Sequence, residues 1–216
     1  SMFYPIKNFT ARGFLWYQGE SNISNYKLYA PMMSAMVKLW RNVWEAPDMP
    51  FYYVQIAPHK YEDSRNIGAA LLRETQVEAL KTIPNSGIIS TTDIGDESCI
   101  HPPQKNVVGN RLATLALTKT YGIRRLPSCG PMMTNVDYLG QKAIVTFDNA
   151  PAGLYPTFSF LEGFEIAGAD KKFYPAKAMI EGRNNTVKVW SEEVLEPVAV
   201  RYAFRNYVGG ITLQNT

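Results

Sequence analysis

Gly13–Asn22 reads GFLWYQGESN, and this stretch decides both the fold and the place of its chemistry. Phe14–Tyr17 is a run of bulky residues without polar alternation, which predicts a strand buried on both faces of a sheet. The run then changes to Gln, Gly, Glu, Ser and Asn. Because α/β proteins place their functional groups at the carboxyl edge of a parallel sheet, this polar cluster predicts a site at that edge.

Helix and strand patterns alternate after this stretch. Two further buried runs predict strands at Phe51–Ala57 and Ile88–Thr92. Apolar residues at helical spacing predict helices at about Tyr26–Trp44, Ala69–Lys81 and Gln104–Tyr121. Strand and helix in alternation indicate a parallel sheet with right-handed crossovers. The predicted fold class is therefore α/β, with a parallel sheet and its helices in three layers.

The second half of the chain has a different pattern. From Thr134 to Thr216, short runs of β-branched and aromatic residues are separated by Gly, Pro and Asn turns. We expect an antiparallel sandwich or half-sandwich here, with strands at residues 143–147, 161–166, 173–180, 186–191 and 198–204. The pattern changes near Pro127–Pro131, which predicts an α/β domain over residues 1–126 and a small antiparallel β-domain over residues 127–216.

The composition is that of a globular protein, with 46% hydrophobic residues. The net charge of +3 is small, and lysines and arginines are scattered among acids, so the sequence predicts no nucleic-acid partner. No apolar stretch approaches the roughly 20 residues of a membrane-spanning helix, so no membrane partner is expected. Cys99 and Cys129 could pair in an oxidising compartment, but two cysteines at this spacing more often remain buried thiols.

The two histidines are the candidates for a base that titrates near neutral pH. His101 follows a predicted strand, precedes a predicted helix, and is followed by Pro102 and Pro103, which stiffen its backbone. An imidazole held in this way is a good general base, although a lone histidine is not a specific motif. His59 lies in a charged loop beside Lys60, which indicates a solvated residue.

Metal and cofactor motifs are missing from the sequence. It contains no HExxH, no paired CxxC and no Asp-x-Asp-x-Asp loop, so we expect no metal. The glycines form neither G-x-G-x-x-G nor a P-loop, which argues against a nucleotide cofactor. GxSxG, the nucleophile elbow of ordinary α/β-hydrolases, is also absent. Glu20 and Asp96 could form the acid pair of a glycosidase if their loops converge, which is one alternative function.

Four motifs stand in order along the chain: GFLWYQGESN, LRETQ at Leu72–Gln76, TTDIGD followed by IHP at Thr91–Pro102, and GNRLATLALTKTYG at Gly109–Gly122. Together they resemble the motifs of the bacterial sialate O-acetylesterases, which belong to the SGNH hydrolases. The tail, with FDNA, GFEIAGAD, FYPAKA and PVAVRYAF, resembles the β-rich segment that follows the catalytic domain in this family. The resemblance therefore covers nearly the whole chain.

The resemblance implies that a serine and a histidine remove O-acetyl groups from sialic acid or a related sugar, in the periplasm or outside the cell. The family's WYQGES motif supplies a side chain to the oxyanion hole, which falls on Gln18. An amide N–H aimed at the developing oxyanion would lower the barrier by roughly 3 kcal/mol. The family's histidine falls on His101, as base toward the serine and then acid toward the leaving alcohol. Glu20, close to Gln18 in the motif, would support the site or contact the substrate.

The chain departs from the family pattern near its histidine. SGNH enzymes commonly hold this histidine with an aspartate three positions earlier, where this chain has Ser98, and Asp93 and Asp96 lie further upstream. Either Asp96 bends back toward His101 as the third triad member, or a backbone carbonyl orients the ring and the site works as a dyad.

The larger departure is the nucleophile. In this family the serine lies in a G-Q-S-N segment near the start of the catalytic domain, and no such segment precedes Phe3 in this sequence. Ser21 imitates the pattern, but Trp16–Gly19 before it matches the oxyanion motif. We therefore expect the C-terminal portion of an esterase, a partial SGNH (flavodoxin-like) domain that lacks its nucleophile and is inactive alone.

An alternative function is a non-catalytic carbohydrate-binding or structural module, in which Trp16 and Tyr17 stack on a sugar. On either interpretation the partner is a small acetylated or free sugar. A parallel sheet that lacks its first strand has an open edge, which the Phe3–Phe9 segment, the C-terminal sheet or a second copy of the chain would cover. A homo-oligomer is expected in the last case.

Overall fold

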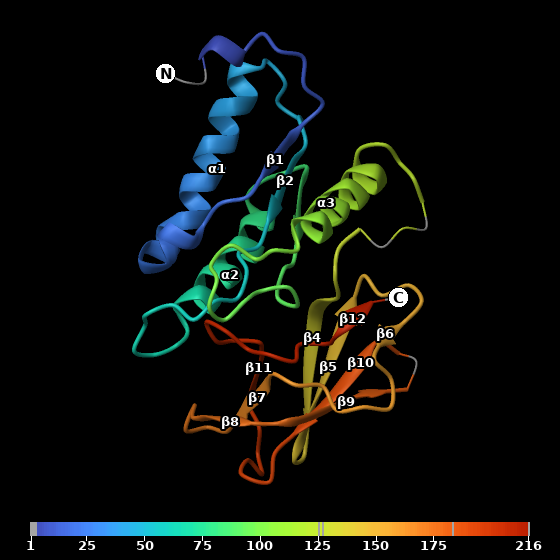
Figure 1. Ribbon diagram of the computed structural model, residues 1–216. Coiled ribbons are helices and arrows are strands. Elements are labelled where there is room, and N and C mark those ends of the chain that lie inside the picture. The colour runs from blue at the N-terminus through green and yellow to red at the C-terminus, as the bar shows by residue number, and fades with distance from the viewer. Residues whose placement is uncertain (1–3, 125, 127, 183, 216) are drawn as a thin grey trace.

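The computed structural model describes residues 4–124, 126, 128–182 and 184–215, so Phe3 and Pro127 lie outside the described residues. Its amino-terminal part is a parallel sheet in the order β1-β2-β3 with helices on both faces (Figure 1). The strands are β1 (Phe14–Trp16), β2 (Phe51–Val54) and β3 (Ser86–Ile89), the helices α1 (Tyr26–Val43), α2 (Gly68–Glu78) and α3 (Lys105–Lys119), and the 3₁₀ helices η1 (Tyr4–Ile6), η2 (Glu20–Asn25) and η3 (Ala79–Lys81). The predicted α/β alternation is confirmed, although β2 and β3 end three residues earlier than predicted.

The three layers follow from the side chains of β2. Phe51 and Tyr53 pack against α1 and α2, whereas Tyr52 and Val54 pack against α3 on the opposite face. All four residues are buried, with exposed fractions of 0–2%. A central strand covered on both faces needs apolar or aromatic side chains at every position, which is why FYYV shows no alternation.

β1 lies at the edge of the sheet and is less covered than predicted. Phe14 and Trp16 are half-buried and pack against Trp40 of α1, with ring centroids 5.1 and 5.5 Å apart. Leu15 points to the other face and is 62% exposed, because α3 packs against β2 and β3 only. The prediction of burial on both faces is therefore wrong for β1. Coverage of this edge by a second copy stays a prediction.

The carboxyl-terminal part consists of antiparallel sheets, as predicted. Its first sheet, in the order β4-β5-β10-β9, contains β4 (Met132–Leu139), β5 (Lys142–Asp148), β10 (Thr186–Trp190) and β9 (Lys177–Glu181). Its second, β11-β7-β8, contains β11 (Ala199–Tyr202), β7 (Phe164–Ala167) and β8 (Phe173–Pro175), and β6 (Leu154–Tyr155) pairs with β12 (Gln214–Asn215). β4 was not predicted, since most of its residues are exposed and give no apolar run.

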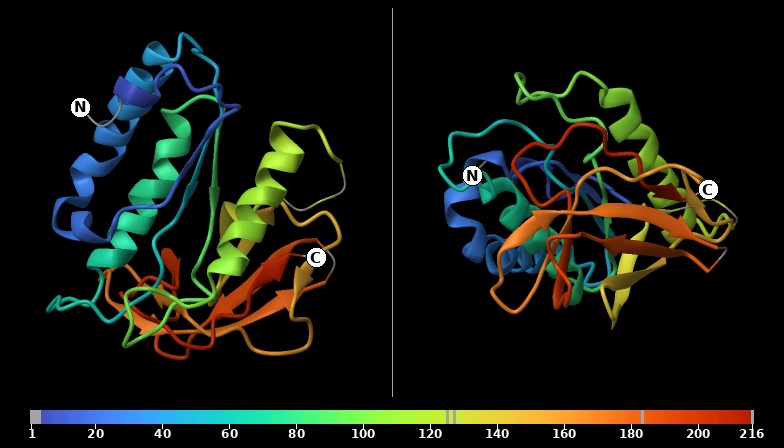
Figure 2. Two further views of the ribbon diagram at one scale, coloured as in Figure 1. Left: turned by 45° about the horizontal axis from the view of Figure 1, so that its top comes forward. Right: turned by 90° about the horizontal axis from the view of Figure 1, so that it is seen from below.

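The turn after β11 joins the two parts of the chain (Figures 1 and 2). Asn206 is fully buried, and its Oδ1 accepts the N–H of Ala69, 2.9 Å away, at the start of α2. Its own N–H donates to the carbonyl of Asn66 at 2.9 Å, and its carbonyl accepts the N–H of His59 at 3.1 Å. The β-rich part therefore holds the loop between β2 and α2 at the carboxyl edge of the sheet.

Arg73 of α2 adds a second link. Its Nη2 donates to the carbonyl of Ala203 at 3.1 Å and to that of Arg205 at 2.5 Å, and its side chain is buried. Burial lowers the pKa of Arg73 to about 10, which still leaves the guanidinium protonated at neutral pH. The division into residues 1–126 and 127–216 stays a prediction, because these bonds tie the two parts together.

Replacing Asn206 tests this link. Asn206→Ala leaves the buried N–H of Ala69 without its acceptor, and we expect it to lower the free energy of unfolding by about 1–3 kcal/mol. Urea denaturation followed by circular dichroism measures the change. The exposed Asn106 on the first turn of α3 gives the matched control, Asn106→Ala, which should change stability by less than about 0.5 kcal/mol. Equal stabilities of the two variants would contradict the link.

Candidate active site

Three polar loops leave the same edge of the sheet. β1, β2 and β3 are parallel, so the loops that begin after Trp16, Val54 and Ile89 all leave from the carboxyl ends of their strands. The first loop carries Gln18 and Glu20, and the third carries both Asp96 and His101. The carboxyl edge of a parallel sheet is where α/β proteins bind their ligands, and the predicted residues lie there.

Gln18 is half-buried and its amide is oriented by a neighbour in the same stretch. Its Nε2 donates to Oδ1 of Asn22 at 2.7 Å. A side-chain amide has two N–H groups, so one remains for a second acceptor. The sequence interpretation missed Asn22, although it stands in the quoted stretch four residues after Gln18, within reach of a helical turn.

Gly19 allows the first loop to approach the core closely. A Cβ at this position would lie 2.7 Å from Cγ2 of Ile56 and 3.2 Å from Nε2 of Gln76. Both neighbours are buried, with exposed fractions of 0%, so neither can move away easily. The glycine in WYQGES is therefore required by packing.

A methyl group at Gly19 tests this close approach. We expect Gly19→Ala to lower the free energy of unfolding by about 1–3 kcal/mol, because the methyl overlaps buried atoms. Gly109, inside α3 with nothing within 4 Å of its Cβ direction, is the control. Gly109→Ala should raise stability by about 0.5–1 kcal/mol through helix propensity. Thermal melts of both variants distinguish the two effects, and a Gly19→Ala protein as stable as the parent would refute the packing argument.

The charge of Glu20 acts on three tyrosine hydroxyls. Burial, and then the charge of Glu20, raise the pKa of Tyr17 to about 12. Burial and the same carboxylate also raise the pKa of Tyr29 and Tyr61. These hydroxyls stay protonated around neutral pH, and that of Tyr17 has no hydrogen-bond partner among the described residues. Glu20 thus acts on these hydroxyls through its charge.

The aromatic residues beside Gln18 do not form a free platform for a sugar. Trp16 packs edge-on against Trp40 in the core, so a stacking role for Trp16 is not supported. The Nζ of Lys105 lies 4.6 Å from the ring centroid of Tyr17 and covers that ring. These contacts argue against the carbohydrate-stacking module considered from the sequence.

His101 is exposed on the loop between β3 and α3. Its carbonyl accepts a weak hydrogen bond from the thiol of Cys99, with the sulfur 3.3 Å away. No described residue forms a hydrogen bond with its ring. The imidazole is therefore accessible to a partner or a substrate.

Neither candidate acid forms a hydrogen bond with His101. Oδ1 of Asp96 accepts the N–H and the hydroxyl of Ser98, both at 2.8 Å, and the N–H of Cys99 at 2.9 Å. Asp93 pairs with the guanidinium of Arg111, at 2.8 and 2.6 Å. Asp96 therefore shapes the loop that carries His101, and Asp93 ties that loop to α3.

The Asp96 turn gives a pH-dependent signal. The hydrogen bond from the Ser98 side chain, followed by those from the N–H groups of Ser98 and Cys99, lowers the pKa of Asp96. The pKa of Asp96 is lower in the folded state than in the unfolded state. The ionised carboxylate therefore stabilises the turn at pH values above the pKa of the unfolded state, and this stabilisation is lost as the pH falls through the pKa of the folded state. We expect Ser98→Ala to raise the pKa, measured by carbon-detected NMR titration, while Ser21→Ala leaves it unchanged. An unaltered pKa in Ser98→Ala would contradict the assigned cause.

His59 differs from the solvated residue that the sequence predicted. It is half-buried, and its Nδ1 lies 3.2 Å from the carbonyl of Asp96. Its ring meets that of Tyr61 edge-on, with centroids 4.9 Å apart. The N–H of Lys60 also donates to the carbonyl of Glu97 at 3.2 Å. The loop after β2 thus supports the loop that carries His101.

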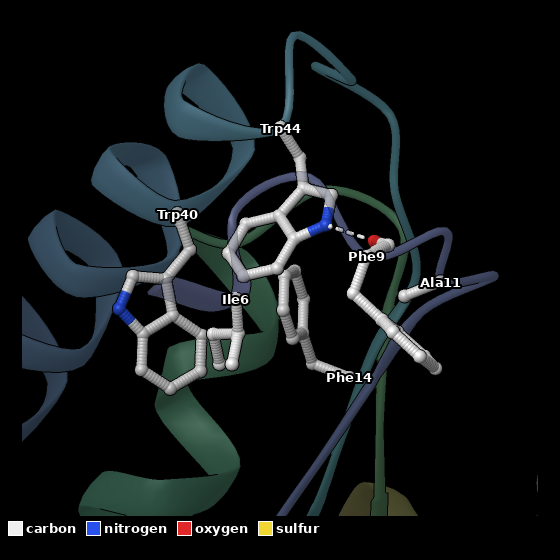
Figure 3. A pocket seen from close by; sticks show the side chains of 6 residues that line it. All are labelled: Ile6, Phe9, Ala11, Phe14, Trp40 and Trp44. Atoms are coloured by element: carbon white, nitrogen blue, oxygen red, sulfur yellow. Dashed lines mark hydrogen bonds between the residues drawn. The ribbon is translucent and has the colours of Figure 1, made fainter. Parts of the chain in front are cut away.

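An apolar groove lies at the opposite edge of the sheet. It measures about 470 Å³ and is lined by Ile6, Phe9, Ala11, Phe14, Trp40 and Trp44 (Figure 3). Phe14 is the first residue of β1, which places the groove at the amino edge. Its lining is apolar, and Nε1 of Trp44 donates to the carbonyl of Phe9 at 2.9 Å. The groove offers no group for acid–base chemistry.

In the part of the chain that the structure describes, no three His, Cys, Asp or Glu residues gather as metal ligands. None of the described helices combines the length and apolarity needed to cross a membrane. Cys99 and Cys129 are free, and Cys99 is exposed, so the expectation of a buried thiol is wrong for Cys99.

The fold and the site define a class of protein: a three-layer α/β protein whose polar residues gather at the carboxyl edge of its parallel sheet. The sequence model of the family described as "Carbohydrate esterase, sialic acid-specific acetylesterase" matches residues 4–118. The chain therefore belongs to the sialic acid-specific carbohydrate acetylesterase family. The predicted resemblance is confirmed.

Relatives of known structure or curated name agree with this assignment. The chain is 29% identical to the sialate O-acetylesterase of Rattus norvegicus over 167 residues, and 29% identical to that of Homo sapiens over 162 residues. These matches cover 68% and 67% of this chain but 31% of each relative. A crystal structure of XAC1771, a carbohydrate acetylesterase from Xanthomonas citri, superposes with a TM-score of 0.91 at 35% identity, covering 99% of this chain and 50% of that one. The chain thus spans about a third to a half of these relatives.

Proposed function

We propose that this chain forms part of the active site of an esterase that removes O-acetyl groups from sialic acid or a related sugar by serine and histidine chemistry. The observation that carries the proposal is the placement of an oriented amide, Gln18, and an open imidazole, His101, on loops at the same carboxyl edge. Membership of the acetylesterase family supports the substrate class. An acetyl ester needs both groups, since an oxyanion and a leaving alkoxide form in turn.

Gln18 is proposed to donate to the oxyanion. Its Nε2 already gives one N–H to Asn22, and the second N–H is proposed to face the carbonyl oxygen of the acetyl group. The hydrogen bond strengthens as that oxygen gains charge, so the amide stabilises the transition state more than the bound ester. Glu20, which follows Gly19 in the chain, is proposed to contact the sugar from the same loop.

His101 is proposed to act as the base. Its ring would take the proton of the serine hydroxyl during attack and return it to the sugar oxygen as the ester bond breaks. Asp96 is proposed to act through the backbone: its carboxylate holds the turn at Ser98 and Cys99, and the ring works with the serine as a dyad. This proposal keeps the dyad of the second arrangement that the sequence allowed, but no backbone carbonyl among the described residues orients the ring.

The nucleophile is proposed to come from a G-Q-S-N segment, which these 216 residues do not contain. Ser21 is exposed on η2, directly after the oxyanion stretch, and we do not assign it the attack. The polypeptide alone is then inactive as an esterase, although it presents the amide and the imidazole.

An aryl acetate assay tests the missing nucleophile. The purified chain should release phenol no faster than a Ser21→Ala variant. Both rates should equal the rate of non-enzymatic hydrolysis in buffer that contains free imidazole. A serine-directed organophosphonate should label neither protein. Turnover or labelling that disappears in Ser21→Ala would show that Ser21 is the nucleophile and that the proposal has it wrong.

The two assigned groups are tested in a polypeptide that also carries the G-Q-S-N segment. There, His101→Ala should lower kcat by about 10⁴-fold or more, and Gln18→Ala by about 10²- to 10³-fold, with an acetylated sialic acid as substrate. His59→Ala serves as the control for a histidine outside the chemistry. The decrease in kcat in His59→Ala should be at least about tenfold smaller than the decrease in His101→Ala. Wild-type turnover in His101→Ala would remove it from the mechanism.

A further inference from the structure

The last residue of LRETQ, Gln76, lies beneath the candidate site and touches three backbone groups. α2 carries it, and its exposed fraction is 0%. Its Oε1 accepts the N–H of Ile56 at 2.9 Å, while its Nε2 lies 3.4 Å from the carbonyl of Val54 and 3.5 Å from that of Gln18. One buried amide thus joins the end of β1 to the end of β2.

Tyr29 of α1 reaches the same carbonyl from another direction. Its hydroxyl donates to the carbonyl of Gln18 at 2.6 Å, and its side chain is buried. Burial raises the pKa of Tyr29, so the hydroxyl keeps its proton and remains a donor around neutral pH. The hydroxyl of Tyr53 donates to the carbonyl of Gln76 at 2.8 Å and steadies the backbone of α2. The carbonyl of Gln18 is therefore held from both α1 and α2.

The side chain of Gln18 is held at its other end. Oδ1 of Asn22 accepts a hydrogen bond from Nε2 of Gln18 at 2.7 Å. Gly19 has no side chain, which lets Gln76 approach the backbone that follows Gln18. Contacts at the backbone carbonyl and at the amide nitrogen together restrict the directions that the remaining N–H can take.

We propose that Gln76 is a positioning residue which, with Tyr29, clamps the backbone of Gln18 so that its free side-chain N–H points to the oxyanion position. The catalytic consequence rests on the proposed role of Gln18, whereas the clamp itself rests on the buried contacts alone. The two can therefore be tested separately.

NMR on this chain tests the clamp directly. The Nε2 cross-peaks of Gln18 are assigned by their loss in Gln18→Ala, and ¹⁵N relaxation then gives the order parameter of the amide. In the parent protein we expect the order parameter of the Gln18 amide to be about 0.8, as for a rigid group. In Gln76→Met we expect this order parameter to fall below about 0.6. Tyr29→Phe removes one hydroxyl, keeps the ring, and should lower the same order parameter. If Gln76→Met does not fold, the result for Tyr29→Phe tests the clamp.

Gln55 provides a matched control at the same edge. Its Nε2 donates to the carbonyl of Arg73 at 3.1 Å, and its Oε1 accepts the hydroxyl of Ser90 at 3.2 Å. It also follows β2 and also reaches α2, but it forms no hydrogen bond with Gln18 among the described contacts. Gln55→Met should leave the Gln18 amide as rigid as in the parent. A rigid Gln18 amide in folded Gln76→Met and in Tyr29→Phe would overturn the clamp, as would equal loosening in Gln55→Met.

Kinetics in a polypeptide that carries the G-Q-S-N segment test the catalytic consequence. Gln76→Met should lower kcat about 10- to 100-fold and leave KM within about twofold, because the geometry of the donor changes and sugar binding does not. Gln55→Met should leave both within about twofold. Full activity in Gln18→Ala would refute the proposed function of Gln18. The NMR experiment would still test the clamp, because it does not depend on activity. Loss of activity in Gln18→Ala but not in Gln76→Met would overturn the positioning role.

Discussion

The hydrogen bonds of one buried amide, Gln76, tie together the elements that carry the candidate site. A fully buried side-chain amide is costly unless its donors and acceptor are satisfied, and here they are satisfied by the ends of two strands. Those partners are backbone groups at and just past the last sheet pairing, where a parallel sheet leaves N–H and C=O groups unpaired. The same bonds therefore complete the sheet edge and fix the loop that holds Gln18.

Much of this arrangement could be predicted from the sequence, because it follows from periodicity. The apolar runs at β2 and β3 and the helical spacing of α1 and α3 are set by which faces are buried. The placement of Gln18 and His101 at the carboxyl edge followed from the same patterns. The chain's family, predicted from four ordered motifs, was confirmed by the comparisons.

Other features depend on contacts that no local pattern encodes. The roles of Asn206 and Gln76 could not be predicted, because their partners lie 137 and 20 residues away in Ala69 and Ile56. The exposure of Leu15 could not be predicted either, since it follows from the edge position of β1. Polar side chains that satisfy distant backbone groups read as ordinary surface residues in a sequence.

The two proposed catalytic groups differ in the contacts that hold them. Gln18 is fixed by buried donors from α1 and α2, whereas His101 stands on an exposed loop shaped by the Asp96 turn and supported by His59. An oxyanion donor has to keep one direction through the whole reaction, because the charge develops on a single oxygen. A histidine that first accepts a proton from a serine and then returns it to a departing alcohol has to serve two oxygens in different places. A rigid amide and a less constrained imidazole match these two tasks, and the difference follows from the depth at which each loop is anchored.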